Sequence, residues 1–289
     1  MTNQFQTTLQ LPDNTTLGIT TFKAKNQAAP TLILHPAFGV KATYYKHFAK
    51  ALSEKGITVV TADLRGHGLS AVRPDKENNY GFLAMINDLK AVANYLKETN
   101  PKTKVYILGH SMGGQVGSLA VAKYPNDFAG LGMIGSPNVY YKGWSNFHYY
   151  RRKLLVYALL PLFGQVMALF PKLKIGGYYT TQKQATEWGY TGQTGNYKVI
   201  GDDFDYEEAM GKVSIPVLAI DIEDDLMAPK AAIKNLYQKF KSTTALTTHT
   251  LTKAATDPKL SHINWPRTAT EKMVEIVGDW IGAKSFDSK

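Results

Sequence analysis

The chain has 289 residues, of which 44% are hydrophobic and 19% charged, so it can bury a sizeable core and is not composed like a disordered protein. The absence of cysteine excludes disulfides, thiolate metal ligands and cysteine nucleophiles, and it agrees with a reducing compartment. The formal net charge is +10, but residues 140–200 hold eight basic residues and one acidic residue and so supply seven of those charges. No basic helix or nucleic-acid motif accompanies this local excess, so the charge does not predict nucleic-acid binding.

The predicted elements alternate between strands and helices along most of the chain. Residues 5–11 and 16–22 alternate in period two around a Pro-Asp-Asn turn, which predicts a β-hairpin. Apolar runs predict further strands within residues 31–36, 57–68, 104–109, 128–137, 215–225 and 244–252. Helices are predicted at residues 43–55, 82–99, 112–124, 229–240 and 267–281.

This alternation is typical of a mostly parallel sheet with helices on both faces. In such sheets the chemistry gathers at the carboxyl ends of the strands. The alternation breaks only between residues 138 and 205, a segment rich in aromatic residues. We therefore expect residues 1–137 and 206–289 to form the core, and residues 138–205 to form a cap inserted over the site.

The segment GHSMG, residues 109–113, matches the G-x-S-x-G nucleophile elbow between a predicted strand and a predicted helix. In an elbow the serine backbone is strained so that its hydroxyl points out of the sheet, and side chains two residues away would collide with backbone. The start of the following helix also directs N–H groups at a developing oxyanion. The alternative is a plain tight turn, but the flanking pattern favours Ser111 as a nucleophile.

A serine nucleophile needs a base and an acid that orients the base, and the elbow predicts the chain order serine, acid, histidine. After the predicted strand at 215–225 the favoured acid is Asp225, which lies in the loop beyond the strand, while Asp224 and Asp221 remain alternatives. His262, in the loop before the last helix, is the expected base. His249 falls inside a predicted strand and is expected to be an ordinary strand side chain.

The oxyanion is expected to be held by the backbone N–H groups of Met112 and Ala37, the latter in the loop after the strand at 31–36. Phe38 replaces Ala37 if the register of that loop differs. His35 and His67 precede the serine in the chain, which favours roles in shaping a loop or a pocket.

Signals for metals and cofactors are weak, and none is predicted. The histidines are scattered, no H-E-x-x-H motif or carboxylate cluster occurs, and the elbow lacks the Lys-Ser/Thr pair of a phosphate-binding loop. Asp88 is expected to be a charge on a helix surface, and Asp63 to cap the end of a strand.

Five motifs together resemble the α/β-hydrolase family: HPAFG, DLRGHGLS, GHSMGG, EDDLMAP and SHINW. They lie within residues from about 30 to 283, and the pattern is similar to the serine-hydrolase branch that contains monoacylglycerol lipases and serine aminopeptidase-like hydrolases. The resemblance implies an eight-stranded, mostly parallel sheet and cleavage of an ester, thioester or amide through an acyl-enzyme. Two positions depart from the pattern, where Pro36 and Ile222 replace glycines usual in the family.

Residues 154–170 carry no charge and are flanked by basic residues. A run of 17 residues broken by proline and glycine is too short for a membrane span, so an apolar cap that lines an acyl or aromatic pocket is favoured. A cap that also contacts an anionic membrane peripherally is the alternative. The cap aromatics expected near the pocket are Tyr140, Tyr141, Trp144, Tyr149, Tyr150, Trp188 and Tyr190.

The sequence thus predicts a serine hydrolase of carboxylesterase or monoacylglycerol-lipase type acting on a relatively apolar small-molecule ester. The polar, alternating N-terminus shows no secretory signal, so a cytoplasmic location is expected. Two other classes remain: an acyltransferase that uses the same three residues, and a non-catalytic ligand-binding protein on the same fold.

Overall fold

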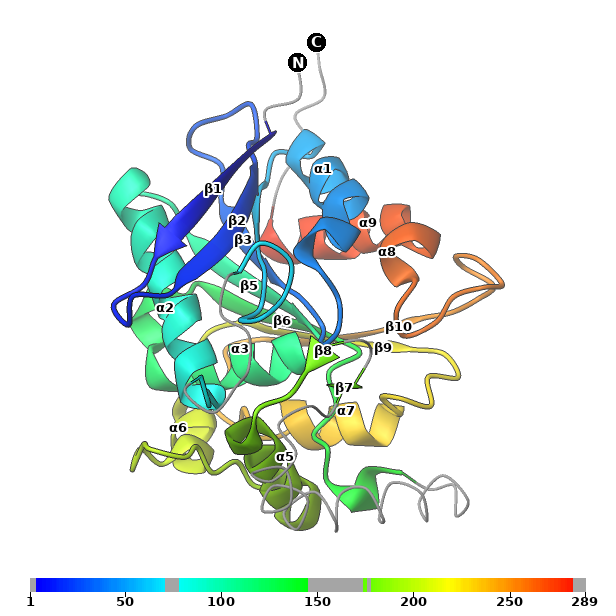
Figure 1. Cartoon of the computed structure of the whole chain (residues 1–289). Coiled ribbons are helices and arrows are strands. Elements are labelled where there is room, and N and C mark those ends of the chain that lie inside the picture. Colours follow the sequence, from blue (N-terminus) through cyan, green and yellow to red (C-terminus); the bar gives the residue numbers. More distant parts are fainter. Residues whose placement is uncertain (1–3, 71–77, 145–173, 176–177, 283–289) are drawn as a thin grey trace.

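The computed structural model describes residues 4–70, 78–144, 174–175 and 178–282 (Figure 1). Eight strands form one sheet in the order β1-β2-β4-β3-β5-β6-β9-β10. Their bounds are β1 Gln4–Gln10, β2 Thr16–Phe22, β3 Thr31–His35, β4 Thr58–Ala62, β5 Val105–His110, β6 Gly130–Ile134, β9 Val217–Ile222 and β10 Leu246–Leu251. The pairs β1–β2 and β2–β4 are antiparallel, and all other neighbouring pairs are parallel.

Helices cover both faces of this sheet, as Figure 1 shows. One face carries α1 (Lys46–Glu54), α8 (Trp265–Thr268) and α9 (Thr270–Ile281). The opposite face carries α2 (Phe82–Thr99), α3 (Met112–Lys123), α6 (Tyr206–Lys212) and α7 (Lys230–Tyr237). The central strands β3, β5, β6 and β9 are buried along almost their whole length, which explains why they are continuously apolar in sequence.

The mostly parallel eight-stranded sheet with helices on both faces confirms the expected fold class. The predicted helix 82–99 agrees with α2 at both ends. The predicted helix 267–281 is wrong in detail, because Ala269 leaves the helical conformation (φ −130°) and separates α8 from α9. The predicted helix 43–55 begins as a 3-10 turn, η1 (Ala42–Tyr45), before α1.

Four regular elements lie in the described part of the segment expected to form the cap. They are a 3-10 turn η3 (Tyr141–Gly143), a two-stranded antiparallel pair of β7 (Lys174–Ile175) and β8 (Tyr178–Tyr179), and helix α5 (Gln182–Thr194). Thr181 and Gln184 form a capping box at the start of α5, and Gly195 ends the helix with a positive φ of 78°. The apolar run 154–170 lies outside the described residues, and the domain boundaries remain a prediction.

Candidate active site

Ser111 occupies the turn between β5 and α3 with φ 54° and ψ −117°, a conformation that is strained for a residue with a side chain. Its N–H donates to the Ile134 carbonyl, which fixes the turn to the neighbouring strand β6 at 3.0 Å. A Cβ added at Gly109 would lie 2.3 Å from the Gly114 nitrogen, and one added at Gly113 would lie 2.2 Å from the His35 carbonyl oxygen. The expected reason for these two glycines, close backbone approach, is confirmed.

Asp225 is the candidate acid that contacts a histidine. One of its carboxylate oxygens, Oδ1, accepts hydrogen bonds from the N–H groups of Met227 (2.8 Å) and Ala228 (3.1 Å). The other, Oδ2, lies 2.6 Å from Nδ1 of His262. The Asp225 side chain is 1% exposed and the His262 side chain 4% exposed, so this contact is shielded from water.

The two alternative acids are occupied elsewhere. Asp221 lies in β9, where its Oδ2 accepts from the Thr250 hydroxyl at 3.1 Å and lies 3.5 Å from the Lys230 ammonium. Asp224 has an exposed side chain that pairs with Lys253 at 2.7 Å. Among the candidate acids, therefore, Asp225 is the residue that the fold brings to His262.

The contact with Asp225 fixes the chemistry of His262. A carboxylate can only accept, so Nδ1 of His262 carries a proton and the opposite nitrogen Nε2 of the neutral ring is free to accept one. The His262 ring lies 5.0 Å, centroid to centroid, from the ring of His110, the residue directly before Ser111. The fold therefore brings an oriented, buried imidazole beside the serine turn.

The loop after β3 departs from the sequence-based expectation. The Ala37 N–H donates to the Tyr45 hydroxyl at 3.1 Å, so it already has an acceptor and does not fit the expected role of oxyanion donor. The Gly39 N–H donates to Nε2 of His67 at 3.1 Å. Between them, the Phe38 N–H has no acceptor among the residues that the structure describes. Met112 is the first residue of α3, and its N–H has no partner within the helix.

His67 and His249 have the roles expected from the sequence. His67 is buried; its Nδ1 donates to the Arg65 carbonyl at 2.9 Å while its Nε2 accepts from Gly39, so it holds two loops together. Burial lowers the pKa of His67, which agrees with a neutral ring. His249 is an exposed side chain on β10.

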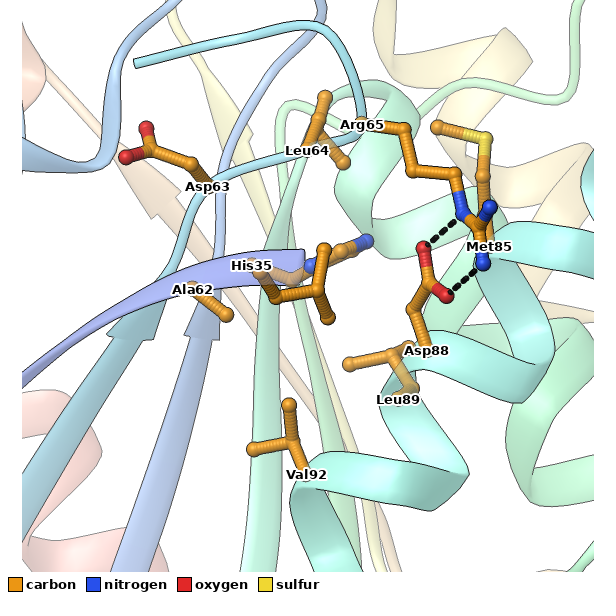
Figure 2. A pocket seen from close by; sticks show the side chains of 10 residues that line it. His35, Ala62, Asp63, Leu64, Arg65, Met85, Asp88, Leu89 and Val92 are labelled. Atoms are coloured by element: carbon orange, nitrogen blue, oxygen red, sulfur yellow. Dashed lines mark hydrogen bonds and ion pairs between the residues drawn. The ribbon is translucent and has the colours of Figure 1, made fainter. Parts of the chain in front are cut away.

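His35 lies at the end of β3, and its ring points into a small cavity next to the Arg65–Asp88 pair (Figure 2). The ring is 3% exposed, and neither of its nitrogens has a hydrogen-bond partner in the described part of the chain. Burial lowers the pKa of His35 to about 3, so it stays neutral. Its place in a pocket lining is as expected.

The expectation for Asp88, a charge on a helix surface, is wrong. Both of its carboxylate oxygens accept from Arg65, at 2.6 and 2.7 Å, and both side chains are 7% exposed (Figure 2). Burial raises the pKa of Asp88 to about 6, although Arg65 acts in the opposite direction. Asp63 does cap the end of β4, because it accepts from the N–H groups of Ala42 (2.7 Å) and Leu69 (3.0 Å).

Aromatic rings form a row from the loop after β3 to the described part of the expected cap. Phe38 packs edge-on against His67 (5.2 Å) and Trp188 (5.8 Å), and His67 stacks on Tyr178 at 4.0 Å. The Trp188 indole N–H donates to the Gln115 side chain on α3 at 2.9 Å, four residues after Ser111. Trp188 is thus the predicted pocket aromatic that the structure places near the serine turn.

The other predicted pocket aromatics are distributed differently. Trp144 is buried in a small cluster with Val139 and Ala232, against which Trp188 packs, and Tyr190 is 37% exposed. Tyr149 and Tyr150 lie outside the described residues. Two residues that the sequence did not single out are Tyr45 and Gln115; no local motif marks them, because their contacts depend on how η1 and α5 dock.

Within the described ranges, no group of three histidine, aspartate or glutamate side chains is arranged to hold a metal ion. The helices in those ranges also include none that combines the length and the apolar character of a membrane span.

The sheet order, the strained serine turn and the buried Asp–His pair define an α/β hydrolase. Among solved structures, the esterase Est1E from Butyrivibrio proteoclasticus superposes with a TM-score of 0.61 at 16% identity, covering 96% of this chain and 99% of that one. At this identity the likeness concerns the fold alone. In sequence, residues 26–189 match the family described as serine aminopeptidase, S33, and the chain belongs to that family.

Relatives carry names of esterases, lipases and acetyltransferases. A monoglyceride lipase of Rattus norvegicus is 32% identical over 31% of this chain and 29% of its own length. A bifunctional esterase/perhydrolase of Acinetobacter calcoaceticus is 25% identical over 70% of this chain and 76% of its own length. An ethanol acetyltransferase 1 of Kluyveromyces marxianus is 28% identical over 44% of this chain and 32% of its own length. The chain thus matches less than a third of the lipase and of the acetyltransferase.

Proposed function

We propose that the protein is a serine hydrolase that cleaves carboxylic esters through an acyl-enzyme. The observation that carries this proposal is the buried 2.6 Å contact between Asp225 and His262, next to a serine held at φ 54°. Family membership and the relatives' names support ester cleavage or acyl transfer.

The reaction would proceed in two halves. The Ser111 hydroxyl attacks the carbonyl carbon of the ester while Nε2 of His262 takes the hydroxyl proton, and the Asp225 carboxylate stabilises the resulting imidazolium. His262 then returns the proton to the alcohol as it leaves. In the second half, water attacks the acyl-enzyme by the same route and releases the carboxylic acid and the free serine.

The oxyanion of each tetrahedral intermediate would be held by the N–H groups of Phe38 and Met112. Phe38 replaces Ala37 in this proposal because the Ala37 N–H is already bonded to Tyr45. Each donor of this kind is typically worth about 3 kcal/mol of transition-state stabilisation.

The surroundings of the site favour an apolar acyl group. The rings of Phe38 and Trp188 flank the proposed oxyanion donor, and Leu226 and Met227, directly after Asp225, are 62% and 53% exposed. Apolar walls with few polar groups bind medium acyl chains or aromatic esters better than sugars or charged peptides. The Trp144 indole N–H reaches the Leu226 carbonyl at 3.3 Å, which supports a cap of residues 138–205 lying next to the acid loop.

Labelling with a fluorophosphonate tests the proposal directly. We expect wild-type protein to be labelled at Ser111 and to hydrolyse p-nitrophenyl esters, with Ser111→Ala abolishing both while the circular dichroism spectrum is unchanged. Ser118→Ala, in the helix α3 that follows Ser111, serves as the matched serine control, because the Ser118 hydroxyl is bonded to the Gly114 carbonyl. Ester hydrolysis retained by Ser111→Ala, or a wild-type protein that is not labelled, would overturn the proposal.

Acyl transfer is the second candidate, and it is favoured by the match to the ethanol acetyltransferase. The same acyl-enzyme would then be attacked by an alcohol in place of water. Product analysis with a p-nitrophenyl ester and increasing ethanol distinguishes the two, because a transferase forms the ethyl ester as its main product at low alcohol concentration.

A further inference from the structure

We propose that Tyr45 is a positioning residue, whose hydroxyl ties the loop that carries the oxyanion donor to the histidine that precedes the nucleophile. This inference rests on the proposed function, and it assigns a role to a residue that lies outside the serine, acid and base. It concerns two side chains, Tyr45 and His110, that are fully buried.

The Tyr45 hydroxyl makes two hydrogen bonds in opposite directions. It accepts the Ala37 N–H at 3.1 Å and lies 2.7 Å from Nδ1 of His110. An amide N–H can only donate, so the phenolic proton is available for His110. The arrangement that gives the phenolic proton an acceptor has Tyr45 donating to Nδ1, which leaves the His110 proton on Nε2, a buried nitrogen without a hydrogen-bond partner in the described part of the chain. His110 is therefore a neutral ring with a defined tautomer.

The surroundings of His110 also favour the neutral ring. Burial lowers the pKa of His110 well below the usual value, and the charge of the nearby His262 ring acts in the same direction, while the His262 backbone acts against both. The ring meets Trp265 edge-on at 5.5 Å and Tyr45 edge-on at 5.9 Å. The carboxylate of Asp225 contacts Nδ1 of His262 and makes no hydrogen bond to His110 in the described structure.

A neutral His110 matters because His262 becomes an imidazolium when it takes the serine proton. A second positive charge 5.0 Å away, centroid to centroid, would oppose that step in the low-dielectric interior. By donating to Nδ1, Tyr45 occupies the position that a second proton on His110 would need.

The same hydroxyl also sets the loop after β3. Because the Ala37 N–H is turned toward Tyr45, the next N–H in the chain, that of Phe38, is left without an acceptor in the described structure. One phenol thus orients both the proposed oxyanion donor and the neighbour of the base. Packing alone does not need this hydroxyl, since the Tyr45 ring contacts Trp265 and Tyr44 through its carbon atoms.

Tyr45→Phe removes the hydroxyl and keeps the aromatic ring, so it tests the hydroxyl alone. We expect the variant to fold and to lose about ten- to a hundredfold in kcat on a p-nitrophenyl ester, with KM changed by less than about threefold, because orientation and not substrate binding is lost. Tyr44→Phe is the matched control: its ring is the neighbour of Tyr45 and packs under Arg267 at 4.7 Å, and its kcat should equal that of wild type.

The second measurement does not depend on activity. In ¹⁵N NMR of wild-type protein labelled at histidine, His110 should show an unprotonated Nδ1 and a protonated Nε2 that do not titrate between about pH 5 and 8, whereas Tyr45→Phe should shift the Nδ1 resonance. An unchanged kcat in Tyr45→Phe, or a wild-type proton on Nδ1 of His110, would overturn the inference. Failure of the proposed function would appear differently, as hydrolysis that survives Ser111→Ala.

Discussion

Two buried carboxylates, Asp225 at the strand ends and Glu187 on α5, accept the same number of backbone hydrogen bonds but differ in their charge partners. Asp225 accepts two N–H groups and in addition faces the His262 ring. Glu187 accepts from the N–H groups of Phe82 (2.7 Å) and Ile200 (2.8 Å) and has no ion pair within the described residues.

This difference separates a chemical role from a structural one. The charge of Asp225 is matched by a ring that becomes cationic in the proposed reaction. Glu187 faces no such ring, and burial raises the pKa of Glu187 to about 7, although the N–H groups of Ile200 and Phe82 and the charge of Lys183 act against this. Glu187 joins α5 to the start of α2, which is a task that needs acceptors but no charge.

The largest expected effect is that of Asp225→Asn. The amide oxygen would take over the bonds to Met227 and Ala228, which turns the NH₂ group toward His262 and forces the His262 proton to Nε2. That tautomer cannot accept the serine proton, so kcat should fall by about 10⁴-fold with little change in stability.

The kcat of Asp225→Asn on a p-nitrophenyl ester, with Asp224→Asn as control, measures this effect. Asp224 is the neighbouring aspartate, and its side chain is 73% exposed. A loss of less than tenfold in Asp225→Asn would mean that His262 is oriented by something else.

Removing the carboxylate of Glu187 on α5 should lower the free energy of unfolding and leave kcat nearly unchanged. Glu187→Ala leaves the buried N–H group of Phe82 and the partly buried N–H group of Ile200 without acceptors, and a buried group of this kind costs about 1–3 kcal/mol. We expect a loss of roughly 2–5 kcal/mol in urea unfolding, with kcat of the folded protein changed much less than in Asp225→Asn.

Glu208→Ala is the matched control for this change. Glu208 lies on α6, is exposed and pairs with Lys212 one helical turn away. Such a surface pair should contribute at most about 0.5 kcal/mol. Equal destabilisation by both substitutions would contradict an anchoring role for Glu187.

The raised pKa of Glu187 also predicts a pH dependence of stability. Its folded pKa of about 7 exceeds the usual value of 4.5, so between these values the folded protein binds more protons than the unfolded chain. The stability of wild type relative to Glu187→Gln should therefore be highest below pH 4.5 and fall as pH rises to about 7, by up to about 3 kcal/mol. Urea unfolding of both proteins from pH 4.5 to 8 measures this difference, and a difference that grows with pH would contradict it.

The sequence predicts the strand-end region well and the α5 region poorly, for physical reasons. Ser111, Asp225 and His262 each follow a strand or precede a helix, and the α/β topology alone brings those positions to one edge of the sheet. The partner of Ala37 depends instead on how Tyr45 docks.

Side-chain partners far apart in the chain are not visible in a local pattern. Glu187 is a lone acid in a basic segment, and nothing in the sequence marks it as buried. Asp88 lies three residues after Met85 and four before Val92, on the buried face of α2, but its partner Arg65 lies in a loop 23 residues earlier. The sequence does not show this partner, so an aspartate in a helix is expected to be an exposed charge.

The smallest expected effect comes from Trp188→Phe, which tests the contact between the two regions. The phenyl ring keeps an edge-on partner for Phe38 but loses the indole hydrogen bond to Gln115. One such bond contributes about 1 kcal/mol, so stability should change by that amount or less. If Trp188 lines the acyl pocket, the ratio of kcat/KM for short and medium p-nitrophenyl esters should change by about two- to tenfold.

Trp280→Phe is the control, because the Trp280 indole nitrogen on α9 has no hydrogen-bond partner in the described structure and the residue packs on Tyr106. Equal selectivity changes in both variants would mean that Trp188 acts through general packing and not through the pocket.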